Sequence, residues 1–206
     1  MAVTLFSEAT VSTSLTLGTV PPARVGPSIT TLQNKIYVFG GRLITPTKVS
    51  NDLFVFSIQA MAWEPISPSS NSPQPSPRYF HSSVSYKDHL IIIGGQGETT
   101  KNEPSNVLND ICFFNLQTKE WEILSFDPLE FPPRYAHLSC VLGHTLVIVG
   151  GQDASNQYLN DMYFFDLDAR MLKKSSIDCG LGSYRSTLSC QPSSKGPITI
   201  FFKYTI

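Results

Sequence analysis

The chain has 206 residues, of which 41% are hydrophobic and 15% are charged, enough apolar material for the core of one large domain or two small ones. Fifteen Lys and Arg residues stand against sixteen Asp and Glu residues, without a run of like charge, and the formal net charge is −1. This balance disfavours nucleic acids and anionic membrane surfaces as partners. No window approaches eighteen consecutive apolar residues, so no transmembrane helix is expected.

The N-terminal residues make a poor secretory signal, because residues 1–20 contain no Lys or Arg and Glu8 interrupts their only apolar stretch. The cysteines show no CxxC spacing, and the chain has no Asn-x-Ser/Thr sequon. The four cysteines are Cys112, Cys140, Cys179 and Cys190. Sparse cysteines and absent glycosylation sites suit an intracellular protein. We therefore expect a cytoplasmic location, either free or at the cell cortex or cytoskeleton.

Residues 1–19 are interpreted as either a flexible leader or an outer strand that closes a sheet. The segment TVSTSLTLG, residues 10–18, alternates modestly between apolar and polar side chains and contains none of the landmarks found later in the chain. Such a segment can add an outer strand to an incomplete sheet, or it can remain unattached as termini often do. The sequence leaves both interpretations open.

A set of landmarks begins after this segment. Arg24 follows a proline-rich stretch, and 16 residues later three apolar residues precede the pair Gly40 and Gly41. An Asn-Asp pair that ends at Asp52 then opens an aromatic-rich run, and Trp63 stands eleven residues after that aspartate. Each landmark is a candidate structural residue of a repeated unit.

The same landmarks return twice at the same offsets. The glycine pairs are 54 and 56 residues apart, and each stands 16 residues after an arginine and is followed by Asn-Asp. The second unit has Arg78, Gly94, Gly95, Asp110 and Trp121, and the third has Arg134, Gly150, Gly151, Asp161 and, at the tryptophan position, Leu172. The units are assigned to residues 20–73, 74–129 and 130–180, with a partial, degenerate fourth unit in residues 181–206.

This recurrence decides how the glycine pair in LIIIGGQG, residues 90–97, is interpreted. A phosphate-binding loop needs a Lys and a Ser or Thr at P-loop spacing and a helix pattern after it, and neither is found. A glycine pair that returns three times in register with other landmarks is architectural instead.

Each unit is predicted to fold as four antiparallel strands. In the second unit the runs rich in β-branched and aromatic residues are FHSSVSY, LIIIGG, ICFFNL and WEIL. Short turns such as Lys87-Asp88 and Gly143-His144 separate such runs, and no stretch keeps a 3.6-residue apolar period over a helical length. The second run is apolar at consecutive positions, as in a strand that is covered on both faces. We expect almost no helix, and sheets that stack to bury their faces.

The order arginine, three apolar residues, Gly-Gly, Asn-Asp and tryptophan resembles the kelch repeat. The resemblance spans roughly residues 20–185, with the glycine pair in three copies and the tryptophan in two. The tyrosine that the family usually has between them is matched only loosely, by Phe54, Phe113 or Tyr163. The resemblance implies an all-β fold, a β-propeller with one four-stranded antiparallel blade per repeat.

The fourth unit departs from the pattern. Arg185 opens it, but Phe201 and Phe202 stand where the glycine pair is expected. Three blades and a partial one make an incomplete propeller, which leaves sheet faces and edges open. The chain is then either a truncated or mis-spliced product of a longer protein, or an arc that another chain completes, with self-association through the open blade edges. Truncation is favoured, because a terminal cap should be polar and ITIFFKYTI is not.

Two classes of loop vary in length between the units. From the second glycine to the aspartate the spacing is 11, 15 and 10 residues, and from the tryptophan to the next arginine it is 15 and then 13. In an antiparallel meander both classes emerge at the same end of the sheet, which we call the variable-loop face. Loops on a rigid scaffold commonly carry recognition, so partner binding is predicted there. The candidate residues are Arg42, Lys48, Gln96, Glu98, Lys101, Glu103, Gln152, Asp153 and Tyr158.

Three Ser-Pro pairs lie in SPSSNSPQPSPR, residues 67–78, at Ser67, Ser72 and Ser76. Proline-directed phosphorylation would add dianionic groups to the variable-loop face and could switch the binding of a partner. The alternative is a proline-rich loop whose prolines serve only to form turns.

No catalytic set is found in the sequence. His81 and His137 both stand three residues after the repeat arginine and are interpreted as packed, hydrogen-bonded structural histidines. No spacing of His, Cys, Asp and Glu suits a zinc or di-metal site, and neither GxSxG nor a Walker sequence occurs. We expect no catalytic residue, cofactor or metal. The repeat arginines are expected to anchor loops or the Asn-Asp aspartates.

Two functional classes remain. The resemblance implies first a non-enzymatic protein–protein interaction module, a scaffold or adaptor in cell-polarity, cytoskeletal, small-GTPase signalling or ubiquitin-ligase complexes. The second class is a propeller enzyme of the oxidase or sugar isomerase type, with its site at the central channel, but the copper ligands of the oxidase type cannot be assembled from this sequence. We expect protein partners, no nucleic acid and no membrane insertion.

Overall fold

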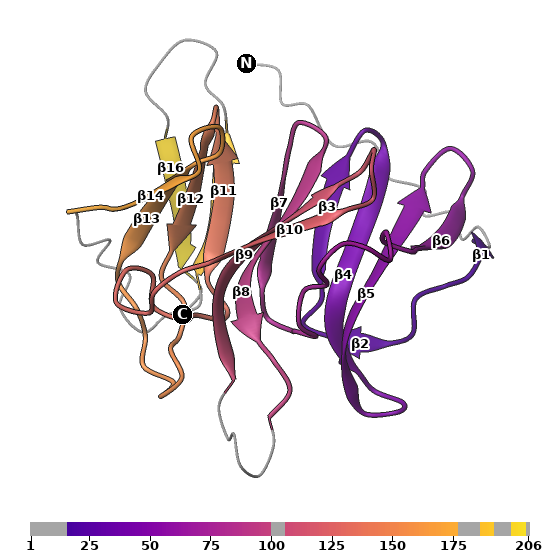
Figure 1. Cartoon of the computed structure of the whole chain (residues 1–206), viewed down its shortest axis with the longest axis horizontal. Coiled ribbons are helices and arrows are strands. Elements are labelled where there is room, and N and C mark those ends of the chain that lie inside the picture. The colour runs from indigo at the N-terminus through magenta and orange to yellow at the C-terminus, as the bar shows by residue number, and fades with distance from the viewer. Residues whose placement is uncertain (1–15, 100–105, 177–185, 192–198, 205–206) are drawn as a thin grey trace, which may run out of the picture.

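The computed structural model of the chain describes residues 16–99, 106–176, 186–191 and 199–204. Over these residues the chain forms sixteen strands and no helix, in agreement with the missing 3.6-residue apolar period. The strands make four sheets that follow one another in chain order (Figure 1). The all-β fold class predicted from the sequence is confirmed.

The first sheet has the strand order β1-β6-β5-β4-β2, and β3 also pairs with β4. Its strands are β1 (Leu17–Gly18), β2 (Arg24–Val25), β3 (Ser28–Leu32), β4 (Lys35–Leu43), β5 (Lys48–Ser57) and β6 (Ala62–Ile66). Strand β1 runs parallel to β6 at the outer edge, with Leu17 opposite Ala62. These two residues of the predicted leader therefore add an outer strand, whereas residues 10–15 lie outside the described residues.

The second and third sheets are four-stranded antiparallel meanders. The second comprises β7 (Ser82–Tyr86), β8 (His89–Gln96), β9 (Val107–Asn115) and β10 (Trp121–Ser125). The third comprises β11 (Leu138–Leu142), β12 (Thr145–Val149), β13 (Met162–Asp166) and β14 (Met171–Lys174). Two strands of a fourth sheet are described, β15 (Ser186–Gln191) and β16 (Thr199–Tyr204), which pair antiparallel.

The first strand of each meander lies against the first strand of the next. Strand β3 contacts β7, β7 contacts β11, and β11 contacts β15. The sheets therefore fan out from a common inner edge, as blades do in a propeller (Figure 1). The described residues form an open arc of three blades and part of a fourth.

The core consists of the apolar layers between neighbouring blades, and strand β8 contributes to two of them. Its residues Leu90 and Ile92 join the cluster shared with the first blade, whereas Ile91 and Ile93 join the cluster shared with the third blade. Successive side chains of a strand point to opposite faces, so a strand between two blades is apolar at every position. The prediction that both faces of this strand are covered is confirmed.

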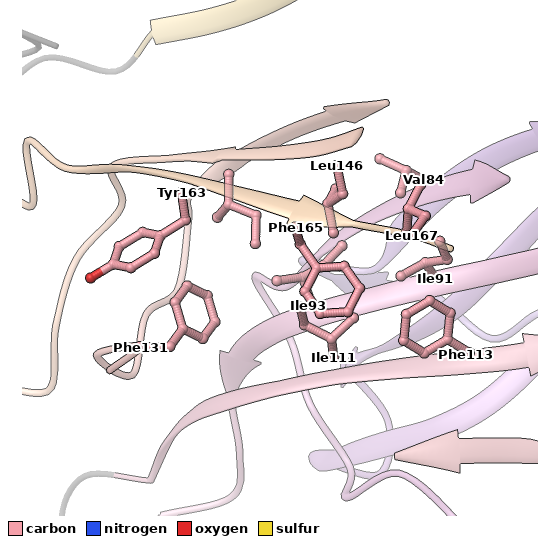
Figure 2. Packing of buried hydrophobic residues seen from close by; sticks show 11 residues of the cluster. Val84, Ile91, Ile93, Ile111, Phe113, Phe131, Leu146, Tyr163, Phe165 and Leu167 are labelled. Atoms are coloured by element: carbon pink, nitrogen blue, oxygen red, sulfur yellow. The ribbon is translucent and has the colours of Figure 1, made fainter. Parts of the chain in front are cut away.

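Aromatic side chains fill much of these layers. Between the second and third blades, Ile93 and Phe113 lie beside Phe165, and Tyr163 lies beside Phe131 (Figure 2). Between the first and second blades, the buried Trp121 ring lies 5.3 Å from the Phe39 ring. At the corresponding position of the third blade, Leu172 packs against the cluster from its edge.

Candidate functional site

In each of the three blades a hydrogen-bonded cluster lies where the strands reach the variable-loop face. It joins the repeat arginine to the repeat aspartate and to the first glycine of the pair, and we call it the lock. Arg78 forms a two-pronged ion pair with Asp110, with Nη1–Oδ1 and Nη2–Oδ2 distances of 2.6 and 2.8 Å. Its Nη1 also donates to the Gly94 carbonyl at 3.0 Å, and its Nε donates to the Ser76 carbonyl at 3.0 Å. One guanidinium thus ties the incoming linker, the glycine pair and the third strand of the blade together.

The lock recurs in the other two blades. In the third blade Arg134 pairs with Asp161 at 2.7 and 3.0 Å and donates to the Gly150 carbonyl at 2.9 Å. In the first blade Arg24 makes the same contacts with Asp52 and Gly40. The guanidiniums of Arg78 and Arg134 are fully buried. Buried arginines held by four hydrogen bonds each in this way serve architecture rather than ligand binding.

The glycine pair also joins each blade to the next. The Gly41 N–H donates to the Arg78 carbonyl at 2.8 Å, and the Gly95 N–H donates to the Arg134 carbonyl at 2.9 Å. Gly94 and Gly95 have φ values of 51° and 105°, which side-chain-bearing residues avoid. The second glycine's N–H is therefore engaged by the next blade, which further disfavours a phosphate-binding loop.

The recurring histidines lie in these junctions. The His81 Nε2 is 2.8 Å from Ser28 Oγ of the preceding blade, and the His137 Nε2 is 2.7 Å from Ser82 Oγ. Burial, followed by the charge of Arg134, lowers the pKa of His137 to about 3. Burial also lowers the pKa of His81 well below its usual value. Both rings are neutral, packed groups that link blades. Their serine partners were not found from the sequence, although both stand four residues after the repeat arginine.

The asparagines of the Asn-Asp pairs have a role that sequence reasoning missed. Asn51 Nδ2 donates to the Pro75 carbonyl at 2.9 Å, and Asn109 Nδ2 donates to the Phe126 and Phe131 carbonyls at 2.8 and 3.0 Å. Each amide therefore holds the linker to the following blade, while the neighbouring aspartate holds the arginine. The recurrence of Asn before Asp was the available signal.

The long loops of the described blades emerge at one end of the sheets, the variable-loop face. Antiparallel strands place the β4–β5 loop, the end of β8 and the start of β9 at this end, toward the bottom of the view in Figure 1. Beyond the lock, each blade adds one more pair of residues: Val25 with Arg42, Tyr79 with Gln96, and Tyr135 with Gln152. These pairs are the last paired residues of each blade before its loops begin.

The predicted binding residues are spread over three blades of this face. Arg42 and Lys48 are exposed on the first blade, Glu98 is exposed on the second, and Tyr158 is exposed on the third. Half-buried are Gln96, Gln152 and Asp153. Lys101 and Glu103 lie outside the described residues. The described candidates therefore lie on separate blades.

Asp153 has a local structural role. Its Oδ1 accepts hydrogen bonds from the backbone N–H groups of Ser155 and Gln157, at 2.8 and 2.9 Å. These bonds shape the loop between β12 and β13, and the Tyr135 hydroxyl donates to Asn156 Oδ1 in the same loop at 2.6 Å. The loop of the third blade is therefore held in one shape by its own polar groups.

The Ser-Pro linker does not lie wholly on the variable-loop face. The Ser69 N–H donates to the Lys119 carbonyl at 2.8 Å, and Lys119 belongs to the β9–β10 turn at the opposite end of the second blade. Ser72 Oγ donates to the Ser69 carbonyl and so lies near that opposite end. Ser67 directly follows β6, and only Ser76 adjoins the lock. The expectation that all three serines would modify the same face is wrong for Ser72.

Within the described residues, no group of three or more His, Cys, Asp and Glu side chains is arranged to hold a metal ion. Cys112 is a free thiol in the core, and burial raises its pKa. Cys140 is disulfide-bonded, a state that is rare in cytosolic proteins. The cytoplasmic location therefore stays a prediction. No helix in the described part of the chain is long and apolar enough to cross a membrane.

The lock, the glycine pair and the stacked four-stranded blades are those of a kelch-repeat propeller. The family model of the KLHDC2/KLHL20/DRC7 Kelch-repeats domain matches residues 2–195. The chain belongs to this kelch-repeat family.

Similar proteins contain the repeat within longer chains. Protein ral2 of Schizosaccharomyces pombe (strain 972 / ATCC 24843) is 33% identical over 197 residues, which cover 84% of this chain and 32% of that protein. Rho GTPase-activating protein gacHH of Dictyostelium discoideum is 30% identical over 138 residues, 65% of this chain and 9% of that protein. Kelch domain-containing protein 3 of Rattus norvegicus is 29% identical over 167 residues, 79% of this chain and 43% of that protein. The chain spans less than half the length of each.

Proposed function

We propose that the chain is a protein-interaction module, a scaffold or adaptor, that holds a protein partner on its variable-loop face. The main support is that the contacts of the lock are the same in three blades whereas the loops beyond it vary. Arginine, glycine pair and aspartate are held alike in three blades, whereas the segments that leave the lock differ in length and side chains. Loops whose length the scaffold does not constrain are free to carry recognition.

The proposal extends to the setting in which the module works. Of the settings that kelch proteins occupy, small-GTPase signalling is supported by the name of one relative, Rho GTPase-activating protein gacHH. We therefore place the chain in a small-GTPase scaffold of the cytoplasm or cell cortex, ahead of cell-polarity, cytoskeletal and ubiquitin-ligase complexes. No observation on the described residues favours the alternative of an enzyme site at the central channel.

The β8–β9 loop is the sharpest place to test the module. The Gly97 N–H donates to the Asn106 carbonyl at 2.7 Å, so residues 98–105 can be exchanged for Asn-Gly, a two-residue hairpin turn that this pair can close. We expect the exchange to leave the unfolding temperature unchanged and to reduce the capture of natural partners, measured by affinity purification from cells with quantitative mass spectrometry.

A matched control lies at the other end of the same sheet. Gln117→Ala combined with Lys119→Gly alters the exposed β9–β10 turn, where Lys119 has a φ of 59° that glycine adopts readily. This variant should capture the same proteins as the unaltered chain. Equal capture by the hairpin variant, or equal loss in the turn variant, would rule out the variable-loop face as the binding surface.

A further inference from the structure

A ladder of backbone hydrogen bonds runs from blade to blade across the variable-loop face. The Phe80 N–H donates to the Gly26 carbonyl at 2.8 Å, and the Ala136 N–H donates to the Phe80 carbonyl at 2.8 Å. All three residues stand two positions after a repeat arginine, and their φ values are 63°, 53° and 53° in chain order. The position therefore requires a left-handed conformation in every blade.

Phe80 is an unfavourable residue for this position. Bulky side chains destabilise the left-handed conformation, which glycine adopts freely, and the other two blades have glycine and alanine here. Phe80 is nevertheless 40% exposed. It lies over Gly26, where a Cβ would come within 2.7 Å of Phe80 Cδ1, and 5.0 Å from the Tyr79 ring. A strained, exposed aromatic side chain on a binding face is a feature of functional sites.

Exposed apolar side chains also occur on the neighbouring blades, one residue after the first repeat arginine and in the β12–β13 loop. Val25 of the first blade is 50% exposed and Tyr158 of the third is 53% exposed. The Tyr79 and Tyr135 backbones are each held by a pair of hydrogen bonds, to Gln96 and Gln152 respectively. The aromatic residues are therefore presented by rigid backbone, which lowers the entropy lost when a partner binds.

The charges of the described loops on this face are divided between its two sides. The described loops of the first blade contribute Arg42 and Lys48, both exposed, and no exposed carboxylate, whereas the exposed Glu64 lies within strand β6. The described part of the β8–β9 loop contributes Glu98, and the linker between the second and third blades contributes Asp127 and Glu130. The repeat arginines and aspartates are paired in the lock and do not alter this division. Lys173 and Lys174 lie in β14, the outer strand of the third blade, away from the loops.

We infer that the face binds an extended segment of a partner protein in which a bulky apolar side chain is flanked by acidic residues on one side and basic residues on the other. The apolar side chain packs on Phe80, the acidic side lies over Arg42 and Lys48, and the basic side lies over Glu98, Asp127 and Glu130. Such complementarity of charge fixes the orientation of the segment. The inference rests on the proposed function and specifies the chemistry of the partner.

The test uses three end-blocked peptides with the 206-residue chain. The first is Glu-Glu-Gly-Phe-Gly-Lys-Lys, the second has Ser for Phe, and the third has the same composition with alternating charges, Glu-Lys-Gly-Phe-Gly-Glu-Lys. Binding is measured by fluorescence anisotropy at about 50 mM salt, where screening is weak. We expect the first peptide to bind about tenfold more tightly than either of the others, the difference that a central aromatic anchor or an oriented charge pattern commonly makes.

Two substitutions test whether the Phe80 ring contacts the partner or only stabilises the fold. Phe80→Gly and Phe80→Asn both suit the left-handed conformation, so we expect an unchanged or raised unfolding temperature together with about tenfold weaker binding of the first peptide. Ile58→Ala, at an exposed apolar residue of the β5–β6 turn at the opposite end, is the matched control and should bind normally.

The charges are tested in the same way. Arg42→Glu combined with Lys48→Glu should abolish the preference for the first peptide over the alternating one, whereas Lys35→Glu, an exposed lysine at the opposite end, should preserve it. If the first peptide binds both Phe80 variants as tightly as the unaltered chain, Phe80 is not the anchor for the apolar side chain. If the first and alternating peptides bind equally, the charges do not orient the segment. If no peptide binds while the β8–β9 hairpin variant still loses natural partners, this inference fails and the proposed function stands.

Discussion

At the scale of single residues, His137 makes stability depend on pH. Its folded-state pKa of about 3 lies below its usual value of 6.5, so protons bind preferentially to the unfolded chain. Its contribution is complete above pH 6.5 and is lost as the pH falls toward about 3. We expect the free energy of unfolding, measured with denaturant, to fall by up to about 1.4 kcal/mol per pH unit from this residue over that window. His137→Gln should flatten the slope.

A second residue-scale prediction concerns the glycine pair. Alanine at Gly95 would place its Cβ 2.7 Å from the Cβ of His81, at a φ of 105°. Both the clash and the conformation act against alanine, so we expect Gly95→Ala to lower the free energy of unfolding by more than about 2 kcal/mol. Gly143→Ala is the matched control, because Gly143 also has a positive φ, 60°, but nothing lies within 4 Å of a Cβ there. Equal effects of the two substitutions, measured by chemical denaturation, would mean that the packing around Gly95 is unimportant.

At the scale of elements, features that recur in each blade could be predicted from the sequence, whereas contacts particular to one blade could not. The burial of β8 could be predicted because it has four consecutive apolar residues. Successive side chains of a strand point to opposite faces, so both faces of this strand must be covered by apolar neighbours. The Ser28–His81 hydrogen bond was missed although the serine position recurs, since its partner lies 53 positions away on the next blade. Phe80 was missed because its position holds a different residue in each blade. The Ser69 contact with Lys119 is a tertiary contact that bends the Ser-Pro linker away from the variable-loop face, and loop composition does not predict such contacts.

At the scale of the whole molecule, the blades contact only their neighbours in the described arc. The first interface is built around Phe39 and Trp121, and the second around Phe113 and Phe165, with no residue common to the two clusters. In such stacked architectures stability is approximately a sum of terms for single units and for neighbouring interfaces. Damage to one interface should therefore lower the stability of the blade beyond it more than that of the distant blade.

Hydrogen exchange can measure this spread of stability blade by blade. Trp121→Ala empties the first interface, at a cost of about 3–5 kcal/mol, and should raise exchange in β4 and β5 of the first blade more than in β12 and β13 of the third. Phe165→Ala, in the second interface, should do the reverse. Because the two variants remove buried aromatic rings of comparable role, each is the control for the other. Equal acceleration of exchange in all blades by both variants would show that the arc unfolds as one cooperative unit, and the nearest-neighbour description would then be wrong for this chain.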